Sequence, residues 1–343
     1  MSTASPRNNL AVANTSVASV AAVPAAVLAC PAEMSVPVRR IATFHTHGLC
    51  DLIFTLPALH SLRESFPGAA ITSVVPPPLA SLLRGSPLVD EVLLRPRGGL
   101  PEQARMMKRL HDHHFDLALA FSGTRKTALY VFSTGAPTRV GYAHAKMEAL
   151  FTHHVEIEGA PNLETHLQLA AAAGCRPHAP DYRGLLSIDA EYSVRAQTLL
   201  DEAQIASPFI AVAPSTNRKS DIRAWPVSRW TAAIEELSTR WPIALVGLSR
   251  APLITDNLKP QKYPVIDLGG RTDLSTLAAL CGKAALFCGL DNGATHLAAA
   301  METPVAAIFD SNDERAIAPR GVAYRIVAEP DGLAQAAREL IGV

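Results

Sequence analysis

Asp51 is the first residue whose type and position suggest chemistry. It stands in the segment His45–Ile53, where an apolar run that predicts a strand passes through a glycine into a helical pattern. A carboxylate at a helix start is commonly a cap that meets unpaired backbone amides and the positive end of the helix dipole. At the carboxyl end of a parallel strand it can instead act as a general base. The residues around Asp51 leave both interpretations open.

A second polar segment, Cys288–Leu297, combines small residues with four polar side chains at an expected helix start. Small residues such as Gly293, next to Asn292, let backbone amides approach an anion, and a helix N-terminus favours negative charge. The segment therefore suits a diphosphate without a metal, and Asp291 could accept a hydrogen bond from a sugar or ribose hydroxyl. His296 is either a phosphate ligand or an ordinary hydrogen-bonded histidine of the helix.

A third segment, Pro214–Pro226, places hydroxyl groups and cations after another apolar run. The hydroxyls of Ser215 and Thr216 and the guanidinium of Arg223 suit a diphosphate leaving group, because they offer hydrogen-bond donors and a fixed positive charge. The alternative is a solvated loop whose charges contact only water. Arg223 comes two residues before a Trp-Pro pair that can start a helix, and it is therefore better fixed than its neighbours.

A basic pair, Arg125 and Lys126, follows the expected strand Asp116–Phe121. Cations at the carboxyl end of a strand could receive an anionic acceptor, and surface ion pairs are an equal alternative. The nearby run His111–His114 resembles a metal cluster in composition. Adjacent residues on a helix diverge around its circumference, so we expect solvent-exposed side chains there and no metal.

Short aliphatic runs alternate with helical patterns from Arg40 onward, which is typical of βαβ units around parallel sheets. The expected strands are Ile41–His45, Ile71–Val75, Glu91–Leu94, Asp116–Phe121, Arg139–Tyr142, Phe209–Ala213, Ile243–Gly247, Val265–Asp267, Leu286–Cys288 and Val305–Phe309. The expected helices are Asp51–Ser65, Glu102–His113, Leu163–Ala173, Ser228–Arg240, Leu274–Cys281 and Asn292–Met301. Ligands bind such folds at the carboxyl ends of the strands, where the polar segments lie.

The segment Gly174–Pro180 cannot continue the helix before it and predicts a linker. We therefore expect a tail over residues 1–37, a first Rossmann-like domain over residues 38–175 and a second Rossmann-like domain over residues 176–343. Ser16–Cys30 is apolar enough to suggest a secretory segment. A single preceding arginine and an internal proline disfavour it, and a start at Met34 would leave the earlier residues dispensable.

Composition excludes several classes of protein. The chain has 343 residues, of which 48% are hydrophobic and 18% charged, so a disordered chain, a coiled coil and a fibre are all excluded. Lys and Arg together number 31, as do Asp and Glu, so no overall charge favours nucleic acid or an anionic membrane. Five cysteines without ligand spacing indicate reduced thiols, and we expect neither disulfides nor a structural zinc.

Taken in order, these segments resemble the lipopolysaccharide heptosyltransferases, glycosyltransferase family 9, over about residues 40–342. The most specific match is DLSTLAALCGKAALFCGLDNGATHLAAAMETPVAAIFD, followed by HGLCDLIFTLPALHSLRESFP near the start. The resemblance implies an α/β fold of the GT-B type, with two Rossmann-like doubly wound domains that face a central cleft. It implies that the domain over residues 38–175 binds the acceptor and that the domain over residues 176–343 binds the nucleotide-sugar. It also implies metal-independent, inverting transfer of a heptose or a similar sugar from an ADP-sugar to a saccharide or lipid-linked acceptor.

The same resemblance assigns roles to individual residues. Asp51 resembles the catalytic base of the family, and Arg125 and Lys126 lie where the acceptor is bound. The residues that resemble donor-binding positions are Ser215, Thr216, Arg223, Asp291, Asn292, Gly293 and His296. No metal and no cofactor are implied beyond the ADP-sugar donor substrate. Cys50 and Asn292 replace a Gly and a Ser of the family pattern, and Gly247–Arg250 lacks the acidic residue that is often found near there for the nucleoside.

The resemblance implies a bacterial enzyme of lipopolysaccharide core assembly, with a nucleotide-sugar donor and a saccharide or lipid-linked acceptor as partners and no nucleic acid. The expected location is the cytoplasm, and peripheral association with the cytoplasmic face of the inner membrane is compatible with it. Two alternatives remain open. One is a nucleotide-sugar epimerase on the same fold, and the other is a catalytically silent paralogue that binds a nucleotide-sugar.

Overall fold

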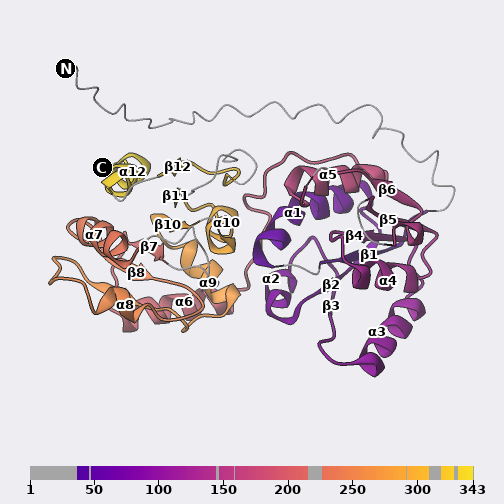
Figure 1. The fold of residues 1–343 in the computed structure, drawn as a ribbon, viewed down its shortest axis with the longest axis horizontal. Coiled ribbons are helices and arrows are strands. Elements are labelled where there is room, and N and C mark those ends of the chain that lie inside the picture. The colour runs from indigo at the N-terminus through magenta and orange to yellow at the C-terminus, as the bar shows by residue number, and fades with distance from the viewer. Residues whose placement is uncertain are drawn as a thin grey trace, which may run out of the picture. The chain divides into compact units, whose positions relative to one another are not determined.

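The computed structural model describes residues 37–45, 48–143, 147–157, 159–214, 226–290, 292–308, 318–327 and 331–342. The chain forms two compact units that divide within helix α6 (Ala190–Glu202), between Ser193 and Val194. We call the described residues up to Ser193 the first unit and those from Val194 the second unit (Figure 1). The tail expected over residues 1–37 lies, apart from Pro37, outside the described residues.

The segment after Gly174 packs with the first unit. The backbone amide of Arg176 donates to Ser65 Oγ at 3.2 Å, and that of His178 donates to Ser61 Oγ at 2.8 Å. Both serines belong to helix α1 (Leu49–Ser65). The domain boundary that the sequence places between residues 175 and 176 stays a prediction.

The first unit is built on a six-stranded parallel sheet with the order β3-β2-β1-β4-β5-β6. Its strands are β1 (Arg40–Phe44), β2 (Ala70–Val75), β3 (Glu91–Leu94), β4 (Leu117–Ala120), β5 (Thr138–Tyr142) and β6 (His153–Val155). The helical elements around it are α1, η1 (Pro77–Leu79), α2 (Ala80–Leu83), α3 (Leu100–Asp112), α4 (Arg125–Ser133), η2 (Glu148–Leu150) and α5 (Leu163–Ala172). This strand order is that of dinucleotide-binding doubly wound folds.

The second unit repeats the plan, with a six-stranded parallel sheet of order β12-β11-β10-β7-β8-β9. Its strands are β7 (Ile210–Ala213), β8 (Ile243–Leu245), β9 (Val265–Asp267), β10 (Leu286–Leu290), β11 (Val305–Ile308) and β12 (Tyr324–Ile326). The helices after α6 are α7 (Val227–Leu237), α8 (Pro252–Thr255), α9 (Leu274–Cys281), α10 (Gly293–Ala300) and α12 (Asp331–Ile341). When the second sheet is followed from β9 to β12, its strands β9-β8-β7-β10-β11-β12 correspond one by one to β3-β2-β1-β4-β5-β6 of the first sheet, so the two sheets have the same topology.

Each sheet has one place where the direction of the strand order reverses. In the first sheet β1 lies between β2 and β4, and Phe44 at its end is level with Ala120 at the end of β4. In the second sheet β7 pairs with β10, and Ala213 is level with Gly289. In doubly wound folds, the chain leaves such paired strands toward opposite sides of the sheet, which leaves room for a ligand at the strand ends.

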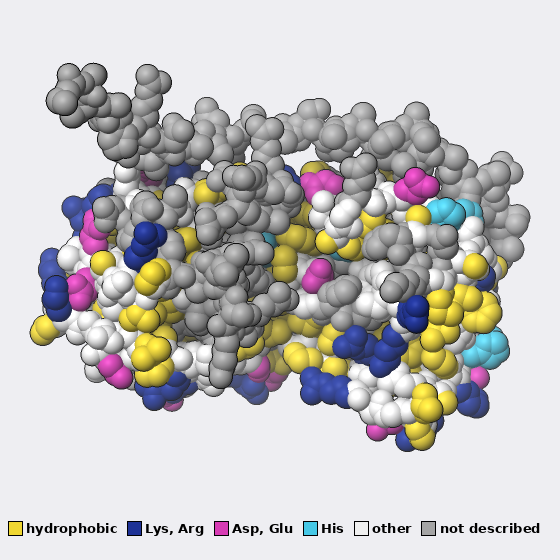
Figure 2. All heavy atoms as spheres, in the orientation of Figure 1, with side chains coloured by type: hydrophobic (Ala, Val, Ile, Leu, Met, Phe, Trp, Pro, Cys, Tyr) yellow, Lys and Arg dark blue, Asp and Glu magenta, His cyan; other side chains and the backbone are white. Residues whose placement is uncertain are grey.

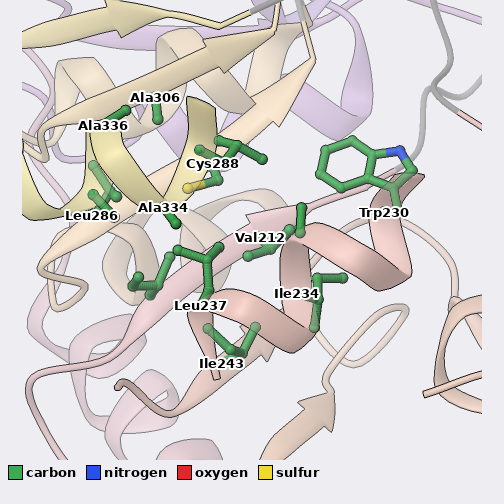
Figure 3. Close-up of a cluster of buried hydrophobic side chains, with 14 of the residues drawn as sticks. Val212, Trp230, Ile234, Leu237, Ile243, Leu286, Cys288, Ala306, Ala334 and Ala336 are labelled. Carbon is green, nitrogen blue, oxygen red and sulfur yellow. The ribbon is translucent and has the colours of Figure 1, made fainter. Parts of the chain in front are cut away.

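Both sheets carry buried apolar side chains on both faces, as expected for parallel sheets that helices cover. In the first unit, α3 and α4 pack over Ala42, Phe44, Ala118 and Ala120, and α1 lies against α5 (Figure 1). In the second unit, Trp230, Ile234 and Leu237 of α7 pack with residues of β7, β8 and α12 (Figure 3). These cores hold the strand ends, and therefore the loops after them, in fixed positions.

Each strand expected from the sequence is present to within two residues at its ends, and so are the expected helices α3, α5, α9 and α10. Helix α1 begins at Leu49, two residues earlier than expected, and α7 ends at Leu237, three residues before the predicted end. The elements that were not expected from the sequence are β6, β12, η1, α2, α4, η2, α6, α8 and α12. The unexpected helix α4 bears on function, because the basic pair expected after the strand Asp116–Phe121 lies in its first turn.

Candidate active site

Asp51 lies in the first turn of α1, just beyond the end of β1. The residue before the helix is Gly48, so Asp51 occupies the third helical position and does not itself precede the helix. Its Oδ2 accepts a hydrogen bond from the backbone amide of Gly48 at 3.1 Å. Asp51 therefore does stabilise the helix start, and its half-exposed carboxylate lies at the reversal point of the first sheet, where a general base would have to be.

His45 follows β1 directly and is directed into the core. Its Nε2 is 3.1 Å from Thr43 Oγ1, its Nδ1 is 3.2 Å from Thr55 Oγ1, and its ring stacks on Phe121 at 5.2 Å. Burial lowers the pKa of this imidazole to about 3, so the ring is neutral near pH 7. His45 connects β1 to α1 and brings no positive charge toward Asp51. Its neighbour His47 lies outside the described residues.

A buried pair, Tyr142 and His166, lies close to Asp51 and was not anticipated from the sequence. The phenolic oxygen of Tyr142 is 2.5 Å from His166 Nδ1. Burial raises the pKa of Tyr142, and the negative charge of Asp51 raises it further, while a hydrogen bond with Thr165 has the opposite effect. Tyr142 therefore keeps its proton, and the effect of the Asp51 charge on its pKa shows that the two side chains are close. The sequence gives no direct signal for this pair, whose members are 24 residues apart.

Arg125 and Lys126 form the first turn of α4, after β4 and on the other side of the same reversal point. Thr124 caps this helix by accepting a hydrogen bond from the amide of Thr127 at 3.2 Å. Arg125 is exposed, and the Lys126 ammonium lies 5.9 Å from the centre of the Tyr130 ring. Cations at a helix N-terminus oppose the helix dipole, so their position is unfavourable unless an anion binds nearby.

Arg95 is a further cation at this edge of the sheet. It follows β3 directly, and its charge acts to lower the pKa of Tyr130, although burial of the phenol has the larger, opposite effect. The Tyr130 hydroxyl also donates to Gln103 of α3. Figure 2 shows Lys and Arg side chains gathered over β3, α3 and α4 of the first unit. The position of Arg95 immediately after an expected strand is the signal by which it could have been found.

The second unit holds its polar loop between β10 and α10. The Thr295 hydroxyl donates to the backbone oxygen of Leu290 at 2.6 Å and ties the helix start to the strand end. Gly289 is required for this approach, because a Cβ there would lie 3.2 Å from Thr295 Oγ1 and 2.7 Å from the Phe287 ring. Asn292 and Gly293, which belong to this loop, are therefore held at the reversal point of the second sheet.

Asn292 caps α10 with its side chain. Its Oδ1 accepts from the amide of Ala294 at 2.8 Å and from that of Thr295 at 3.4 Å. The amides of Ala294 and Thr295, which could have bound a diphosphate at this helix start, are thus already paired with Asn292. For the amide of Gly293, the described part of the chain provides no hydrogen-bond acceptor. An anion at this helix would therefore meet Gly293 first.

Of the remaining donor-binding candidates, the structure describes His296 alone. His296 is fully buried within the second unit, so its direct contact with a phosphate stays a prediction. Asp291, Ser215, Thr216 and Arg223 lie outside the described residues. In the sequence, Ser215 comes two residues after the end of β7, the strand that pairs with β10.

The loop Gly247–Arg250 receives a carboxylate from the neighbouring strand. Asp267, at the end of β9, accepts from the amides of Ala251 and Gly269, both at 2.9 Å, and its side chain is only 2% exposed. A buried carboxylate with these bonds orders the loop and is not available to a ligand. The structure therefore provides an acidic residue near this loop, and its role is structural.

The sequence matches the family model of glycosyltransferase family 9 (heptosyltransferase) over residues 103–339. The lipopolysaccharide heptosyltransferase 3 of Escherichia coli K12 is 23% identical over 283 residues, which cover 78% of this chain and 80% of that protein. The glycosyltransferase family 9 structure from Veillonella parvula has a TM-score of 0.78 at 16% identity and covers 90% of this chain and 98% of that one. The structure of E. coli ADP-heptose lipopolysaccharide heptosyltransferase II has a TM-score of 0.71 at 19% identity, with coverages of 88% and 98%.

The solved structures share the GT-B fold with this chain, which confirms the expected pair of Rossmann-like units. Within the part of the chain that the structure describes, no helix has the length and apolar composition needed to cross a lipid bilayer. The family model covers more than half of the sequence and includes the polar loop of the second unit and the basic pair of the first. The chain belongs to glycosyltransferase family 9, the heptosyltransferases, and is a glycosyltransferase.

Proposed function

We propose that this enzyme transfers a heptose, or a closely similar sugar, from an ADP-sugar to a saccharide or lipid-linked acceptor of the lipopolysaccharide core. The transfer inverts the anomeric centre and uses no metal ion and no cofactor. The related structure from E. coli is described as an ADP-heptose enzyme, and the curated relative is a lipopolysaccharide heptosyltransferase. Membership in their family supports the same donor and acceptor classes here.

The reaction needs one base and one site for the departing diphosphate. The acceptor hydroxyl attacks the anomeric carbon, a new glycosidic bond forms, and the bond from that carbon to the diphosphate oxygen breaks. Asp51 takes the hydroxyl proton, while ADP leaves with the bonding electrons and the configuration is inverted. A single carboxylate is sufficient because the displacement has one step and forms no covalent enzyme intermediate.

The observation that carries this proposal is the position of the candidate residues on the two sheets. Asp51 and the Arg125–Lys126 pair follow β1 and β4, and Asn292 and Gly293 follow β10, which pairs with β7. These four strands flank the two reversal points, where doubly wound folds bind their ligands. Ser215, Thr216 and Arg223 follow β7 in the sequence and are proposed, with Asp291 and His296, as donor contacts.

The basic side chains of the first unit support an anionic acceptor. Arg125, Lys126 and Arg95 follow β4 and β3, and the first turn of α4 contains no acidic residue to neutralise the pair. Core saccharides that carry carboxylates or phosphates would be attracted to such a surface. We extend the proposal to peripheral association with the cytoplasmic face of the inner membrane, where a lipid-linked acceptor would be reached.

The direct test is incubation of the purified enzyme with ADP-heptose and a heptose-deficient core oligosaccharide, in parallel with UDP- and GDP-sugars. We expect acceptor-dependent release of ADP and a product heavier by one heptose in mass spectrometry, with inverted configuration by NMR. Activity should survive EDTA at a temperature well below unfolding. Conversion of the sugar nucleotide without an acceptor would support the epimerase alternative instead. Donor binding without any turnover would support the catalytically silent paralogue.

A further inference from the structure

Three potential metal ligands converge where α1 meets the segment after α5. His60 and Glu64 belong to α1, and His178 belongs to the segment that follows α5. His60 Nδ1 is 3.4 Å from Glu64 Oε2, and His178 Nδ1 is 3.8 Å from the same oxygen. One ligand atom of each residue lies within 4.8 Å of the other two. No other group of three such side chains meets this criterion among the residues that the structure describes.

The backbone holds these side chains together. His60 and Glu64 are four residues apart on one helix, a spacing that places both on the same face. His178 is fixed by its own amide, which donates to Ser61 Oγ at 2.8 Å. That serine lies next to His60 and is fully buried, so the segment that carries His178 is anchored against α1. The convergence therefore does not depend on flexible side chains alone.

The electrostatics of the cluster leave a place for a cation. His60 Nδ1 is buried and has no hydrogen-bond partner among the described residues, although Glu64 Oε2 is near. The two imidazole rings are 4.2 Å apart and inclined at 48°, so they do not stack flat on each other. A bound cation would satisfy both nitrogens and the Glu64 carboxylate together.

The distances suit a tetrahedral ion. With metal–ligand bonds of about 2.0–2.1 Å, ligand atoms around tetrahedral zinc are about 3.3–3.4 Å apart. The 3.4 and 3.8 Å separations in the cluster are close to this value, and the ligand atoms of the two histidines lie within 4.8 Å of each other. Two histidines and one glutamate form a ligand set that zinc uses with a water molecule in the fourth position. Mg²⁺ and Ca²⁺ prefer oxygen ligands and fit this set poorly.

We propose that His60, Glu64 and His178 form a binding site for a divalent transition-metal ion of the zinc type. The bound ion links the C-terminal half of α1 to the segment after α5, where the serine contacts of Arg176 and His178 already join them. Asp51 lies nine residues before His60, which is about 14 Å along the helix axis. The ion therefore takes no part in sugar transfer, and it stabilises the first unit by binding to the folded chain alone.

The test uses the full-length protein, freed of any polyhistidine tag, stripped with EDTA and titrated with Zn²⁺ and Co²⁺. We expect one equivalent of metal to bind, a visible absorption of tetrahedral Co²⁺, and a rise in melting temperature with metal concentration. His60→Ala and His178→Ala should each weaken binding about 100-fold or more, because even an outer partner of a metal ligand contributes about 10–100-fold. Glu64→Gln is a third variant, which removes the negative charge but keeps the size of the side chain, so a loss of metal binding could not be explained by a cavity.

The matched control is His113→Asn. His113 also faces a glutamate, with its Nδ1 3.6 Å from Glu91 Oε2 and similar exposure, and it belongs to no three-ligand group in the described structure. This variant should bind metal as the wild type does. Absence of stoichiometric metal in the wild type would overturn the proposal. Binding that survives all three cluster variants, or that the control loses equally, would overturn it as well.

Discussion

The assignment of Asp51 as the base can be separated from its role in the helix by an isosteric substitution. Asp51→Asn keeps the size of the side chain and an oxygen that can accept the 3.1 Å bond from the Gly48 amide. What it removes is the negative charge and with it the ability to take a proton. We therefore expect turnover to fall by about 10²–10⁴, the usual contribution of a general base. That range corresponds to about 3–5 kcal/mol of the activation barrier.

The structural cost of the same change is small. The lost attraction between a carboxylate and the helix N-terminus is worth about 0.3–1 kcal/mol. In a unit of roughly this size, 1 kcal/mol shifts the melting temperature by about 2–4 °C. Affinity for ADP, measured by isothermal titration, should be nearly unchanged because the donor is proposed to bind the second unit. A large loss of turnover with a small loss of stability is thus the expected pattern.

Glu102→Gln is the matched control for this experiment. Glu102 stands in the first turn of α3, and its Oε2 accepts from the amide of Gly98 at 2.9 Å, so it serves a helix start as Asp51 does. The control should lose a similar amount of stability and keep its turnover. Wild-type turnover in Asp51→Asn would refute the assignment of the base. Equal losses of turnover in both variants would show that helix capping, and not proton transfer, explains the effect.

Four further predictions follow from the structure. Asn292→Asp should keep the cap of α10, with little change in melting temperature, but its charge should repel the diphosphate. Calorimetry should show that the affinity for ADP is about 10–100-fold weaker. Equal affinity would show that the diphosphate does not bind at this helix. Lys126→Ala should raise KM for the acceptor and leave KM for the donor unchanged in steady-state kinetics. The pKa of His45 is about 3 in the folded state, so the unfolded chain binds the extra proton between about pH 6.5 and 3. The free energy of unfolding should therefore fall as the pH drops through this range, by at most about 1.4 kcal/mol per pH unit. His45→Gln should reduce this slope in urea titrations. A chain that starts at Met34 should keep the melting temperature and the ADP affinity, and a large loss of either would contradict the expected dispensability of residues 1–33.

The parts of the fold that could be predicted are those with strong local patterns. The strand Leu117–Ala120 is buried at every position, as a central parallel strand requires, and its apolar run is visible in the sequence. Helix α6 was missed because it buries only Ala196 and Leu200 over the 13 residues of Ala190–Glu202, which leaves a weak pattern. Strand β12 has three half-buried residues at the edge of its sheet, too few to show a period.

The candidate site follows the same division. The positions of Asp51 and Asn292 after strands were predictable, because each strand end is marked by a change from apolar to polar residues. The contacts around them were not, since they join distant parts of the chain. Tyr142 meets His166 across 24 residues, and His178 meets α1 across more than a hundred. Such pairs depend on the order of the strands and the packing of helices, which no local period encodes.

The helix N-termini at the reversal points carry different charges, and each charge matches one requirement of the proposed sugar transfer. Helix α1 presents the carboxylate of Asp51, as a proton acceptor must, and α4 presents Arg125 and Lys126, which suit an anionic saccharide. Helix α10 has a neutral cap and no acidic side chain in its first turn, so the positive end of its dipole is left for an anion. The Oδ1 of Asn292 accepts hydrogen bonds from two backbone amides, and its Nδ2 can still donate to an anion. A carboxylate at this position would instead repel the anion. If these helix starts served folding alone, acidic residues would be favoured at all three.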